Sequence, residues 1–334
     1  MANRLATVFG GSGFIGRHLV QRLASQGWRV RVAVRDVEKA SFLKPMGDVG
    51  QVVPVYADLA KEDSIAAAVA GAELVVNLVG ILYEGRKRKF QAVHVDGAAR
   101  IAAAAKAAGV AKLVHVSALG DSAGSASAYA RSKAAGEEAV RAAFPTATIL
   151  RPSVVFGPED EFFNRFAALS TFTPVLPVFV ADGFKPKFCG RIPCGIDLFG
   201  SGGAKFQPVY VGDVAEAIVV ASYRAETAGQ TFELGGPRVY TYKQIMELTL
   251  AASGRHRLLV PKPMAAARFL AAFLQYLPKP LLTPDQVKLL AVDNVVGAEA
   301  QGLGELGIIP TAAEVIVPTY LKRFSNPYIH RTLA

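Results

Sequence analysis

The chain has 334 residues, of which 51% are hydrophobic and 19% charged, and its formal net charge is +10. This length suffices for one large core, or for one core with a smaller lobe. No uncharged stretch reaches the roughly 18 residues that a membrane-spanning helix needs, so a transmembrane protein is excluded. The basic residues are scattered and carry no nucleic-acid-binding motif, so nucleic acid is the least favoured anionic partner.

Six short apolar runs in the first half of the chain predict β-strands. They are residues 5–9, 30–34, 52–56, 74–79, 113–116 and 148–150. No secretory signal precedes the first run, so we expect the protein inside a cell. Continuous apolar runs of this kind are typical of strands that are buried on both faces of a parallel sheet.

Helical segments separate these runs. In residues 13–25 the apolar residues Ile15, Leu19 and Leu23 recur at helical spacing, and an Ala-rich helix is predicted from residue 90 to 108, before Gly109. Strands that alternate with helices predict a doubly wound α/β fold with a parallel sheet. We assign residues 1–151 to a domain with this Rossmann-type fold.

The alternation ends after Pro152, and residues 152–334 are assigned to a smaller, mainly helical C-terminal lobe that also adds late strands and helices to the Rossmann core. Residues 172–207 are rich in Pro, Gly and Phe and are predicted to be irregular. A strand at 207–211 and a helix at 213–223 follow. Thr241 and Gln244 form a predicted capping box at the start of another helix, and residues 264–282 predict an amphipathic helix followed by a turn.

The glycine-rich segment from Gly10 to Gly16 follows the first strand and opens the first helix. One glycine permits the tight turn, another lets backbone N–H groups approach a pyrophosphate, and the third allows close packing of the helix on the strand. The pyrophosphate would then lie at the positive end of the helix. Because a full series of strands and helices surrounds this loop, the sequence predicts a dinucleotide site.

The end of the second strand indicates which dinucleotide is bound. An NAD site usually carries an acid about 20 residues beyond the loop, to bind the ribose 2′-hydroxyl. Arg35 stands there instead, and its guanidinium would pair with the 2′-phosphate of NADP(H), which Arg17 can also approach. A shift of one residue would place Asp36 on the ribose, so NADPH is favoured over NADH without being the only choice.

Two further segments follow strands at the same edge. Asp58 and Leu59 would flank the adenine, although Asp58 can instead be read as a helix N-cap. The residues from Asn77 to Gly80 would line the ribose and nicotinamide. The basic run at residues 86–89 is typical either of a solvated loop tip or of a contact for an anionic partner. Cys189 and Cys194 have no His or Cys cluster nearby, so no metal site is predicted and they are interpreted as ordinary thiols.

These segments together resemble the extended and atypical branches of the short-chain dehydrogenase/reductase superfamily. The matching segments are GGSGFIG at 10–16, Asp58-Leu59, YARSK at 129–133, RPS at 151–153 with FGP at 156–158, and PVYVGD at 208–213. The resemblance implies that Tyr129 and Lys133, one helical turn apart, bind the nicotinamide ribose and exchange a proton with a substrate oxygen. Ser117 would polarise that oxygen, but such enzymes have their serine one place later, where this chain has Ala118.

The resemblance also implies which residues contact the cofactor. They are Gly10, Ser12, Gly13, Phe14, Ile15, Gly16, Arg17, Arg35, Asp58, Leu59, Leu78, Val79, Gly80, Ser117, Tyr129, Lys133, Pro152 and Ser153.

More specifically, the chain is similar to the short-chain-dehydrogenase-like accessory subunit of respiratory complex I and its bacterial relatives. The segments that carry this likeness are ATVFG at 6–10, PMGD at 45–48, VVNL at 75–78, VHVS at 114–117, FP at 144–145, QPVYV at 207–211 and LGI at 306–308. It implies a tightly held NADPH without established turnover, and a place near the junction of the peripheral arm and the membrane, beside the quinone-site subunits. The Ala-rich composition favours a bacterial member, peripheral on the cytoplasmic face of the inner membrane.

Two functions therefore stand open. The first is a complex I accessory subunit in which NADPH has a structural role. Its basic surface and its amphipathic segment at 264–277 suit an anionic lipid surface. The second is a free NADP(H)-dependent oxidoreductase or nucleoside-diphosphate-sugar epimerase that uses Tyr129 and Lys133, with residues 171–207 as a substrate lid. A redox-sensing regulator that binds NADP without turnover is a third idea.

Overall fold

The computed structural model describes residues 4–85, 88–180, 185–189, 192–277 and 280–325. The chain forms two compact units. Unit 1 takes in residues 1–153, 211–235 and 296–310, and unit 2 takes in residues 154–210, 236–295 and 311–334. The chain crosses from one unit to the other after residues 153, 210, 235, 295 and 310, which makes five crossings.

Unit 1 is built on a sheet of parallel strands in the order β13-β6-β5-β4-β1-β2-β3. The strands are β1 (Leu5–Phe9), β2 (Arg29–Val34), β3 (Val52–Tyr56), β4 (Leu74–Asn77), β5 (Lys112–Val116), β6 (Thr148–Pro152) and β13 (Thr231–Leu234). All six strands predicted from the sequence are present, and the order is that of a Rossmann fold. β13 extends the sheet beside β6; late strands were expected in this sheet, but no strand was predicted at residues 231–234.

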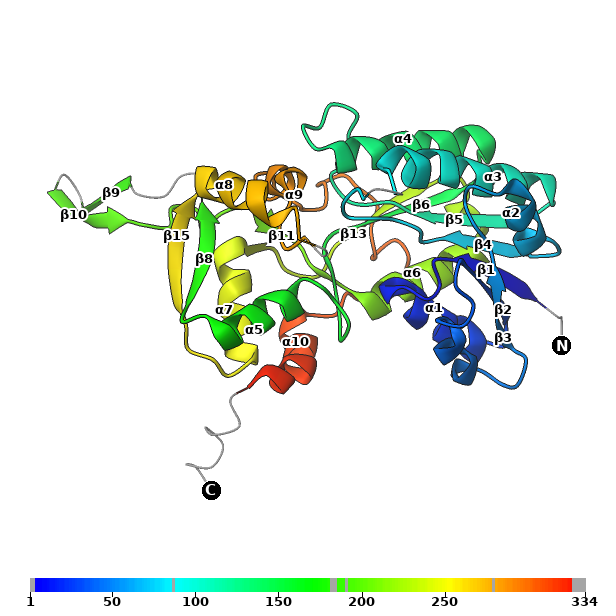
Figure 1. Ribbon diagram of the computed structural model, residues 1–334, viewed down its shortest axis with the longest axis horizontal. Helices are drawn as coiled ribbons and strands as arrows, with labels where there is room; N and C mark the ends of the chain where they lie inside the picture. The colour runs from blue at the N-terminus through cyan, green and yellow to red at the C-terminus, as the bar shows by residue number, and fades with distance from the viewer. Residues whose placement is uncertain (1–3, 86–87, 181–184, 190–191, 278–279, 326–334) are drawn as a thin grey trace, which may run out of the picture. The chain divides into compact units, whose positions relative to one another are not determined.

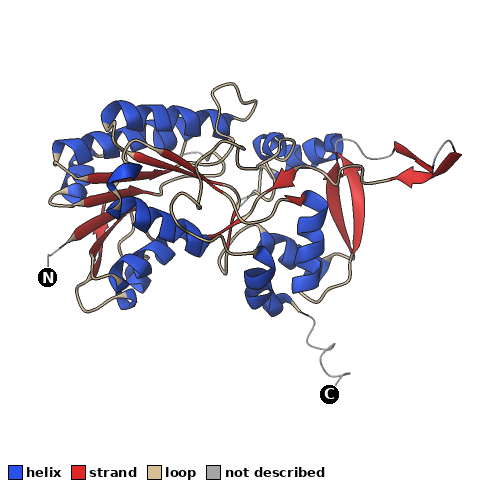
Figure 2. Cartoon of the chain, turned by 180° about the vertical axis from the view of Figure 1, so that it is seen from behind, coloured by secondary structure: helices blue, strands red, loops and turns tan. Residues whose placement is uncertain are grey.

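Helices cover both faces of this sheet (Figures 1 and 2). They are α1 (Phe14–Ser25), α2 (Glu62–Val69), α3 (Gly97–Ala107), α4 (Ala128–Ala143) and α6 (Val211–Tyr223), with short turns η1 (Ser41–Met46), η2 (Gln91–Asp96) and η3 (Ala225–Thr227). In Figure 1, α2, α3 and α4 lie on one face, and α1 and α6 lie on the other. The doubly wound α/β fold predicted from the sequence is therefore confirmed.

The helix predicted from residue 90 to 108 begins differently from the expectation. Its first part, η2, is a π-helical turn, and regular α-helix begins only at Gly97. The η2 backbone lies against α4, where a Cβ on Gly136 would be 2.2 Å from the carbonyl oxygen of His94. Only glycine permits this close approach.

Unit 2 combines helices with short two-stranded sheets. The helices are α5 (Phe163–Phe172), α7 (Tyr242–Ala252), α8 (Met264–Leu274), α9 (Pro284–Leu289), α10 (Ala313–Leu321) and the short turn η4 (Lys322–Phe324). The strands are β7 (Val155–Phe156), β8 (Val175–Val180), β9 (Lys185–Cys189), β10 (Ile192–Asp197), β11 (Lys205–Phe206), β12 (Val209–Tyr210), β14 (Tyr240–Thr241) and β15 (Leu258–Pro263). The predicted capping box of Thr241 and Gln244 is present at the start of α7.

The prediction that residues 172–207 are irregular is wrong for much of this stretch. β8 pairs with β15, and β9 pairs with β10 as a hairpin. In β8 the side chains of Leu176, Val178 and Val180 are buried; the prolines around them obscure the alternation in the sequence. The strand expected at 207–211 is reduced to β12. Among the described helices, none has the length and apolar character to cross a bilayer.

Candidate functional site

The carboxyl ends of the parallel strands of unit 1 meet at one edge of its sheet. In the strand register, Phe9 lies beside both Ala33 and Asn77, and Asn77 lies beside His115. The segments that leave these strands therefore start side by side. Parallel α/β sheets bind ligands at this edge, and the residues expected to bind a dinucleotide lie here or in the first two turns of α4.

The glycine-rich loop joins β1 to α1. Gly10 has a φ of 77°, and a Cβ on it would lie 3.1 Å from the carbonyl carbon of Leu78. A Cβ on Gly16 would lie 2.5 Å from the carbonyl oxygen of Gly10. Gly13 is the N-cap residue of α1 and offers no side chain to cap it. Ser12, Phe14 and Ile15 of this loop are partly buried. A helix start without a side-chain cap, beside a glycine-rich loop, is suited to a pyrophosphate.

Arg35, Asp36 and Arg17 lie near this loop in the chain and differ in what they contact. Arg35 follows β2, is exposed, and has no ion-pair partner within the described residues. Asp36 accepts a hydrogen bond from the backbone N–H of Lys39 at 3.1 Å and pairs with the Lys39 ammonium at 2.9 Å. These contacts with Lys39 lower the pKa of Asp36. Arg17 donates to the Gly13 carbonyl at 3.4 Å.

Asp58 closes a turn between β3 and α2. Its Oδ1 accepts a hydrogen bond from the N–H of Ala60 at 3.0 Å. Lys61, and not Asp58, is the N-cap residue of α2, so the alternative interpretation of Asp58 as a helix N-cap is wrong. Leu59 packs against α3, where a Cβ on Gly97 would lie 2.7 Å from Leu59 Cδ1.

The segment after β4 is held by a buried asparagine. The side-chain nitrogen of Asn77 lies 3.1 Å from Nδ1 of His115, and Asn77 Oδ1 accepts from the N–H of Val79 at 3.0 Å. Burial lowers the pKa of His115 well below its usual value, so the neutral ring accepts the amide hydrogen. Leu78, Val79 and Gly80 are thereby fixed beside the glycine loop.

His94 in η2 is a site residue that the sequence analysis missed. Its Nε2 accepts a hydrogen bond from the N–H of Ile81 at 3.0 Å, and its Nδ1 lies 2.8 Å from Oγ of Ser132. Burial lowers the pKa of His94 to about 3, so the neutral ring donates from Nδ1 to Ser132. The ring also packs edge-on against Tyr129. A single histidine in a helix carries no sequence signal for this role.

Tyr129 and Lys133 lie on α4, one helical turn apart. Lys133 is buried, and its Nζ donates to the carbonyl oxygen of Val116 at 2.9 Å. Burial lowers the pKa of Lys133, while the carboxylates of Asp121 and Glu137 act in the opposite direction. Burial raises the pKa of Tyr129, and the negative charge of Asp121 raises it further. Tyr129 therefore keeps its proton at neutral pH.

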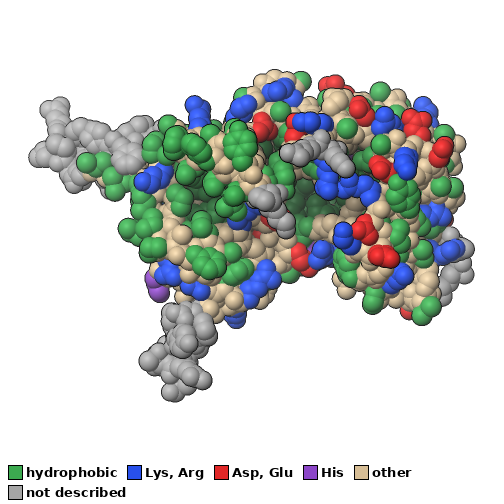
Figure 3. Space-filling model, in the orientation of Figure 1, with side chains coloured by type: hydrophobic (Ala, Val, Ile, Leu, Met, Phe, Trp, Pro, Cys, Tyr) green, Lys and Arg blue, Asp and Glu red, His purple; other side chains and the backbone are tan. Residues whose placement is uncertain are grey.

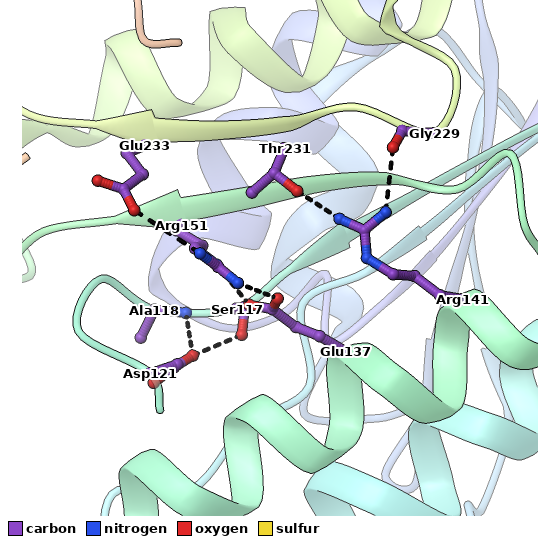
Figure 4. A network of polar contacts seen from close by, with 9 residues as sticks. All are labelled: Ser117, Ala118, Asp121, Glu137, Arg141, Arg151, Gly229, Thr231 and Glu233. Carbon is purple, nitrogen blue, oxygen red and sulfur yellow. Dashed lines mark hydrogen bonds and ion pairs between the residues drawn. The ribbon is translucent and has the colours of Figure 1, made fainter. Parts of the chain in front are cut away.

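Ser117, at the end of β5, is engaged by a second residue that the sequence analysis missed (Figure 4). Its hydroxyl lies 2.6 Å from Oδ2 of Asp121, which also accepts from the N–H of Ala118 at 2.9 Å. An ionised carboxylate only accepts hydrogen bonds, so the Ser117 hydroxyl is the donor. The proton that would polarise a substrate oxygen is directed at Asp121 instead.

An ion-pair network joins α4 to the sheet behind this site. Arg151 on β6 binds both carboxylate oxygens of Glu137, at 2.9 and 2.7 Å, and lies 3.7 Å from a carboxylate oxygen of Glu233 on β13 (Figure 4). Glu137 is only 3% exposed. Pro152 and Ser153 follow directly, both buried, with the Ser153 N–H donating to β13 at 2.9 Å. The network fixes the helix that carries Tyr129 and Lys133.

The remaining sequence-based expectations fall partly outside the described residues. In the part of the chain that the structure describes, no group of three or more His, Cys, Asp or Glu residues is placed to hold a metal ion. The side chains of Cys189 and Cys194 are outside that part, as are residues 86 and 87 of the basic run. In the same run, Lys89 pairs with Glu84 at 3.3 Å.

Comparisons with known proteins identify the family. The NAD dependent epimerase/dehydratase family matches residues 6–235. Mitochondrial NADH dehydrogenase (ubiquinone) 1 alpha subcomplex subunit 9 of Arabidopsis thaliana is 39% identical over 318 residues, which cover 92% of this chain and 74% of the relative. The subunit of the same name from Mus musculus is 36% identical, with 98% of this chain and 81% of the relative covered.

Two further comparisons, one with a protein sequence and one with a solved structure, show a likeness that is shorter or less close in sequence. Ceramide reductase of Caulobacter vibrioides is 40% identical over 177 residues, which cover 53% of this chain and 54% of the relative. The crystal structure of UDP-glucose 4-epimerase from Thermus thermophilus in complex with NAD has a TM-score of 0.67 at 18% identity, covering 96% of this chain and 98% of that one, and shows the shared fold. The chain therefore belongs to the NAD dependent epimerase/dehydratase family, and within it to the group of the alpha subcomplex subunit 9 of NADH dehydrogenase.

Proposed function

We propose that the protein is an NADP(H)-binding accessory subunit of respiratory complex I, in which the nucleotide stabilises the fold and is not turned over. The observation that carries this proposal is the likeness to plant and mouse complex I subunits over nearly the whole chain. The protein would be peripheral, on the cytoplasmic face of a bacterial inner membrane, where the peripheral arm meets the quinone-site subunits.

The residues of unit 1 are suited to a dinucleotide that is bound but not turned over. The glycine loop offers an uncapped helix start for a pyrophosphate, and Tyr129 and Lys133 stand at the same edge of the sheet. A bound nicotinamide would supply a hydride. However, Ser117 donates its proton to Asp121, and the raised pKa of Tyr129 makes its hydroxyl a weak acid. Both features oppose proton transfer to a substrate carbonyl.

The contacts of Arg35 and Asp36 support NADPH as the nucleotide. Asp36 is occupied by the backbone N–H and the ammonium of Lys39, whereas the guanidinium of Arg35 is exposed at the end of β2. A guanidinium binds a phosphate through two parallel hydrogen bonds. Denaturing the purified protein and identifying the released nucleotide tests this choice: we expect NADPH or NADP+, and stoichiometric NAD+ or NADH would refute it.

A tagged copy purified from its native membranes in mild detergent tests the accessory-subunit proposal. We expect the other subunits of complex I to accompany it in fixed ratio. A matched preparation of the variant Lys133→Met, which removes the buried ammonium at the nucleotide site, should retain less of the complex. Recovery of the wild-type protein without any complex I subunit would overturn the proposal.

The surface of α8 in unit 2 supports an anionic bilayer as one contact of the protein. This helix buries Ala267 and Ala271 but exposes its large side chains, with Phe269 67% and Phe273 63% exposed. Tyr276 just beyond it is 83% exposed. Figure 3 shows apolar side chains gathered over α8. No acidic residue lies between residues 247 and 285, while the basic residues there are Arg255, Arg257, Lys262, Arg268 and Lys279. An exposed apolar helix face in a stretch of chain that is basic and free of acidic residues suits anionic headgroups.

Sedimentation with vesicles tests this contact. We expect binding to vesicles that contain anionic phospholipid, weaker binding to neutral vesicles, and loss of binding in the double variant Phe269→Ser, Phe273→Ser. The double variant Val49→Ser, Val53→Ser, at exposed apolar positions of unit 1, is the control and should bind normally. If the protein does not bind anionic vesicles but still purifies with complex I, the lipid contact is wrong and a protein surface covers α8.

A free NADP(H)-dependent reductase is the second candidate, because Tyr129 and Lys133 are both present on α4 and ceramide reductase is a relative over half of the chain. Screening of carbonyl substrates with NADPH tests it. In this case Tyr129→Phe should abolish any activity found. An activity that survives unchanged in Tyr129→Phe would refute the role of Tyr129 as proton donor.

A further inference from the structure

Asp121 carries a buried oxygen for which the described residues offer no partner. Its Oδ2 accepts from the Ser117 hydroxyl at 2.6 Å and from the Ala118 N–H at 2.9 Å, whereas its Oδ1 is buried without any hydrogen bond. A buried carboxylate oxygen without a donor is costly, and such groups in native proteins call for an explanation. Asp121 lies in the loop between β5 and α4, at the edge of the sheet where a dinucleotide is expected.

The charged groups around Asp121 do not supply the missing donor. From α4, Lys133 attracts the carboxylate electrostatically, but its Nζ donates to the carbonyl oxygen of Val116 and makes no hydrogen bond to Asp121 Oδ1. Glu137, also on α4, repels the carboxylate, and Arg151 on β6 is paired with Glu137. The negative charge of Asp121 raises the pKa of Tyr129, also on α4. Burial is the largest effect and raises the pKa of Asp121 to about 6.

We propose that Asp121 is a nucleotide-binding residue, whose Oδ1 accepts a hydrogen bond from a hydroxyl or amide N–H at the nicotinamide end of the NADP(H) held at Tyr129 and Lys133. The inference rests on the proposed nucleotide site and adds to it a residue that the sequence motifs do not include. A nucleotide donor satisfies the carboxylate oxygen of Asp121 for which the described residues offer no hydrogen bond. The same carboxylate accepts the Ser117 proton through its other oxygen. Asp121 would therefore both bind the nucleotide and keep Ser117 from polarising a substrate oxygen.

The contact predicts that nucleotide binding releases a proton from Asp121. A donor stabilises the ionised carboxylate, so the nucleotide selects the deprotonated form. Near and below pH 6 part of the free protein must lose a proton to bind, whereas at pH 8 Asp121 is already ionised. The affinity for NADPH should therefore weaken below pH 6, toward about tenfold per pH unit. The 2′-phosphate of NADPH itself titrates at about pH 6. The effect of Asp121 is therefore the difference in pH dependence of NADPH binding between wild type and Asp121→Asn.

Calorimetry of NADPH binding in two buffers of different ionisation enthalpy measures the protons released. At pH 6 we expect wild-type protein to release more protons than Asp121→Asn, and at pH 8 the two should release equal numbers. Glu138→Gln removes an exposed carboxylate on α4, next to Glu137 in the chain, and should behave as wild type. Equal proton release by wild type and Asp121→Asn at pH 6 would overturn the inference.

Infrared difference spectra of the wild-type protein provide a second measurement that does not depend on folding of the variant. At pH 5.5, addition of NADPH should remove the carbonyl band of a protonated carboxyl group. An unchanged band would overturn the inference even if Asp121→Asn fails to fold. Protein that binds no NADPH would contradict the proposed function, whereas protein that binds NADPH without proton release from Asp121 would contradict only this inference.

Discussion

Arg151 illustrates how single side chains hold the site in place. It bonds to Glu137 on α4 and lies within ion-pair distance of Glu233 on β13, so one guanidinium joins three elements of unit 1. The paired Glu137 is almost fully buried, whereas the side chain of Arg151 is 29% exposed. Removal of the cation would leave a buried carboxylate uncompensated, which costs more than the intact pair contributes.

We therefore expect Arg151→Met to lower the free energy of unfolding by about 2 kcal/mol, less than the loss of a fully buried pair because Arg151 is partly exposed. The double variant Arg151→Met, Glu137→Gln should recover part of this loss, since the charge left behind is removed. Urea unfolding of the three proteins measures both effects. A double variant that is less stable than Arg151→Met would contradict the argument.

Arg35 provides the residue-level test of nucleotide choice. Hydrogen bonds to charged groups contribute about 1.5–3 kcal/mol each, so Arg35→Ala should weaken NADPH binding by roughly 10- to 100-fold. Binding of NADH, which lacks the 2′-phosphate, should change little. Asp36→Asn is the matched control, and we expect its nucleotide preference to match wild type because Asp36 is occupied by Lys39. Fluorescence titration with both nucleotides measures these affinities; equal losses for NADPH and NADH in Arg35→Ala would rule out the phosphate contact.

At the scale of elements, the close approach of η2 to α4 positions the aromatic surroundings of Tyr129. Phe90, just before η2, and His94 within it both pack edge-on against the Tyr129 ring. This arrangement depends on Gly136, because its missing side chain leaves room for the carbonyl oxygen of His94. A side chain there would push η2 away from α4.

Gly136→Ala should thus destabilise the protein by about 1–3 kcal/mol, the usual range for overpacking, and should weaken NADPH binding. An alanine normally stabilises a helix relative to glycine, so destabilisation here would be diagnostic of the close contact. Gly304→Ala is the control, since a Cβ there would meet nothing within 4 Å. Thermal unfolding of both variants gives the comparison, and equal stability of Gly136→Ala and wild type would contradict it.

The elements also show what the sequence could and could not predict. The six strands of the first half were found because continuous apolar runs mark strands that are buried on both faces. β13 was missed because it is only four residues long and includes a glutamate, whose role depends on Arg151 far away in the chain. The glycine loop was predicted from local spacing and the Tyr129–Lys133 pair from the family resemblance, and both lie at the predicted edge of the sheet or on the helix beside it. His94 acts through contacts with Ile81 and Ser132, which are distant in the chain, so no local pattern reveals it. Asp121 contacts Ser117 and Ala118 close by, but an aspartate in a loop carries no signal that distinguishes it from a solvated one.

At the scale of the whole molecule, we expect two buried histidines to contribute to the loss of stability in acid. Burial lowers the pKa of His94 from its usual 6.5 to about 3, and His115 is shifted in the same direction. A group with a lowered pKa takes up a proton on unfolding, so its contribution to stability is present above pH 6.5 and is lost as the pH falls toward 3. Asp121 acts oppositely: its pKa is raised from 3.8 to about 6, and its contribution is lost as the pH rises through 6.

His94→Gln should make the loss of stability between pH 6 and pH 4 shallower. Each proton taken up on unfolding corresponds to about 1.4 kcal/mol per pH unit, and the glutamine amide can still accept and donate. Urea unfolding at pH 7, 5 and 4 measures the slope. His256→Gln, at an exposed histidine of unit 2, should keep the wild-type slope, and an unchanged slope in His94→Gln would show that His94 does not take part.

The five crossings of the chain between the two units have a consequence for the order in which the protein is made. The backbone N–H of Glu233 on β13 donates to Gln301 at 2.7 Å, and the Glu233 carboxylate accepts from the N–H of Gly297 at 2.9 Å. The edge strand of unit 1 therefore lacks these two hydrogen bonds until Gly297 and Gln301, some sixty positions later in the chain, have been synthesised. Domains usually fold as they emerge, starting from the N-terminus, but here unit 1 is incomplete until residues 296–310 have been synthesised. The glycine loop is synthesised well before them, so a nucleotide captured early would hold the unfinished sheet together until this segment arrives.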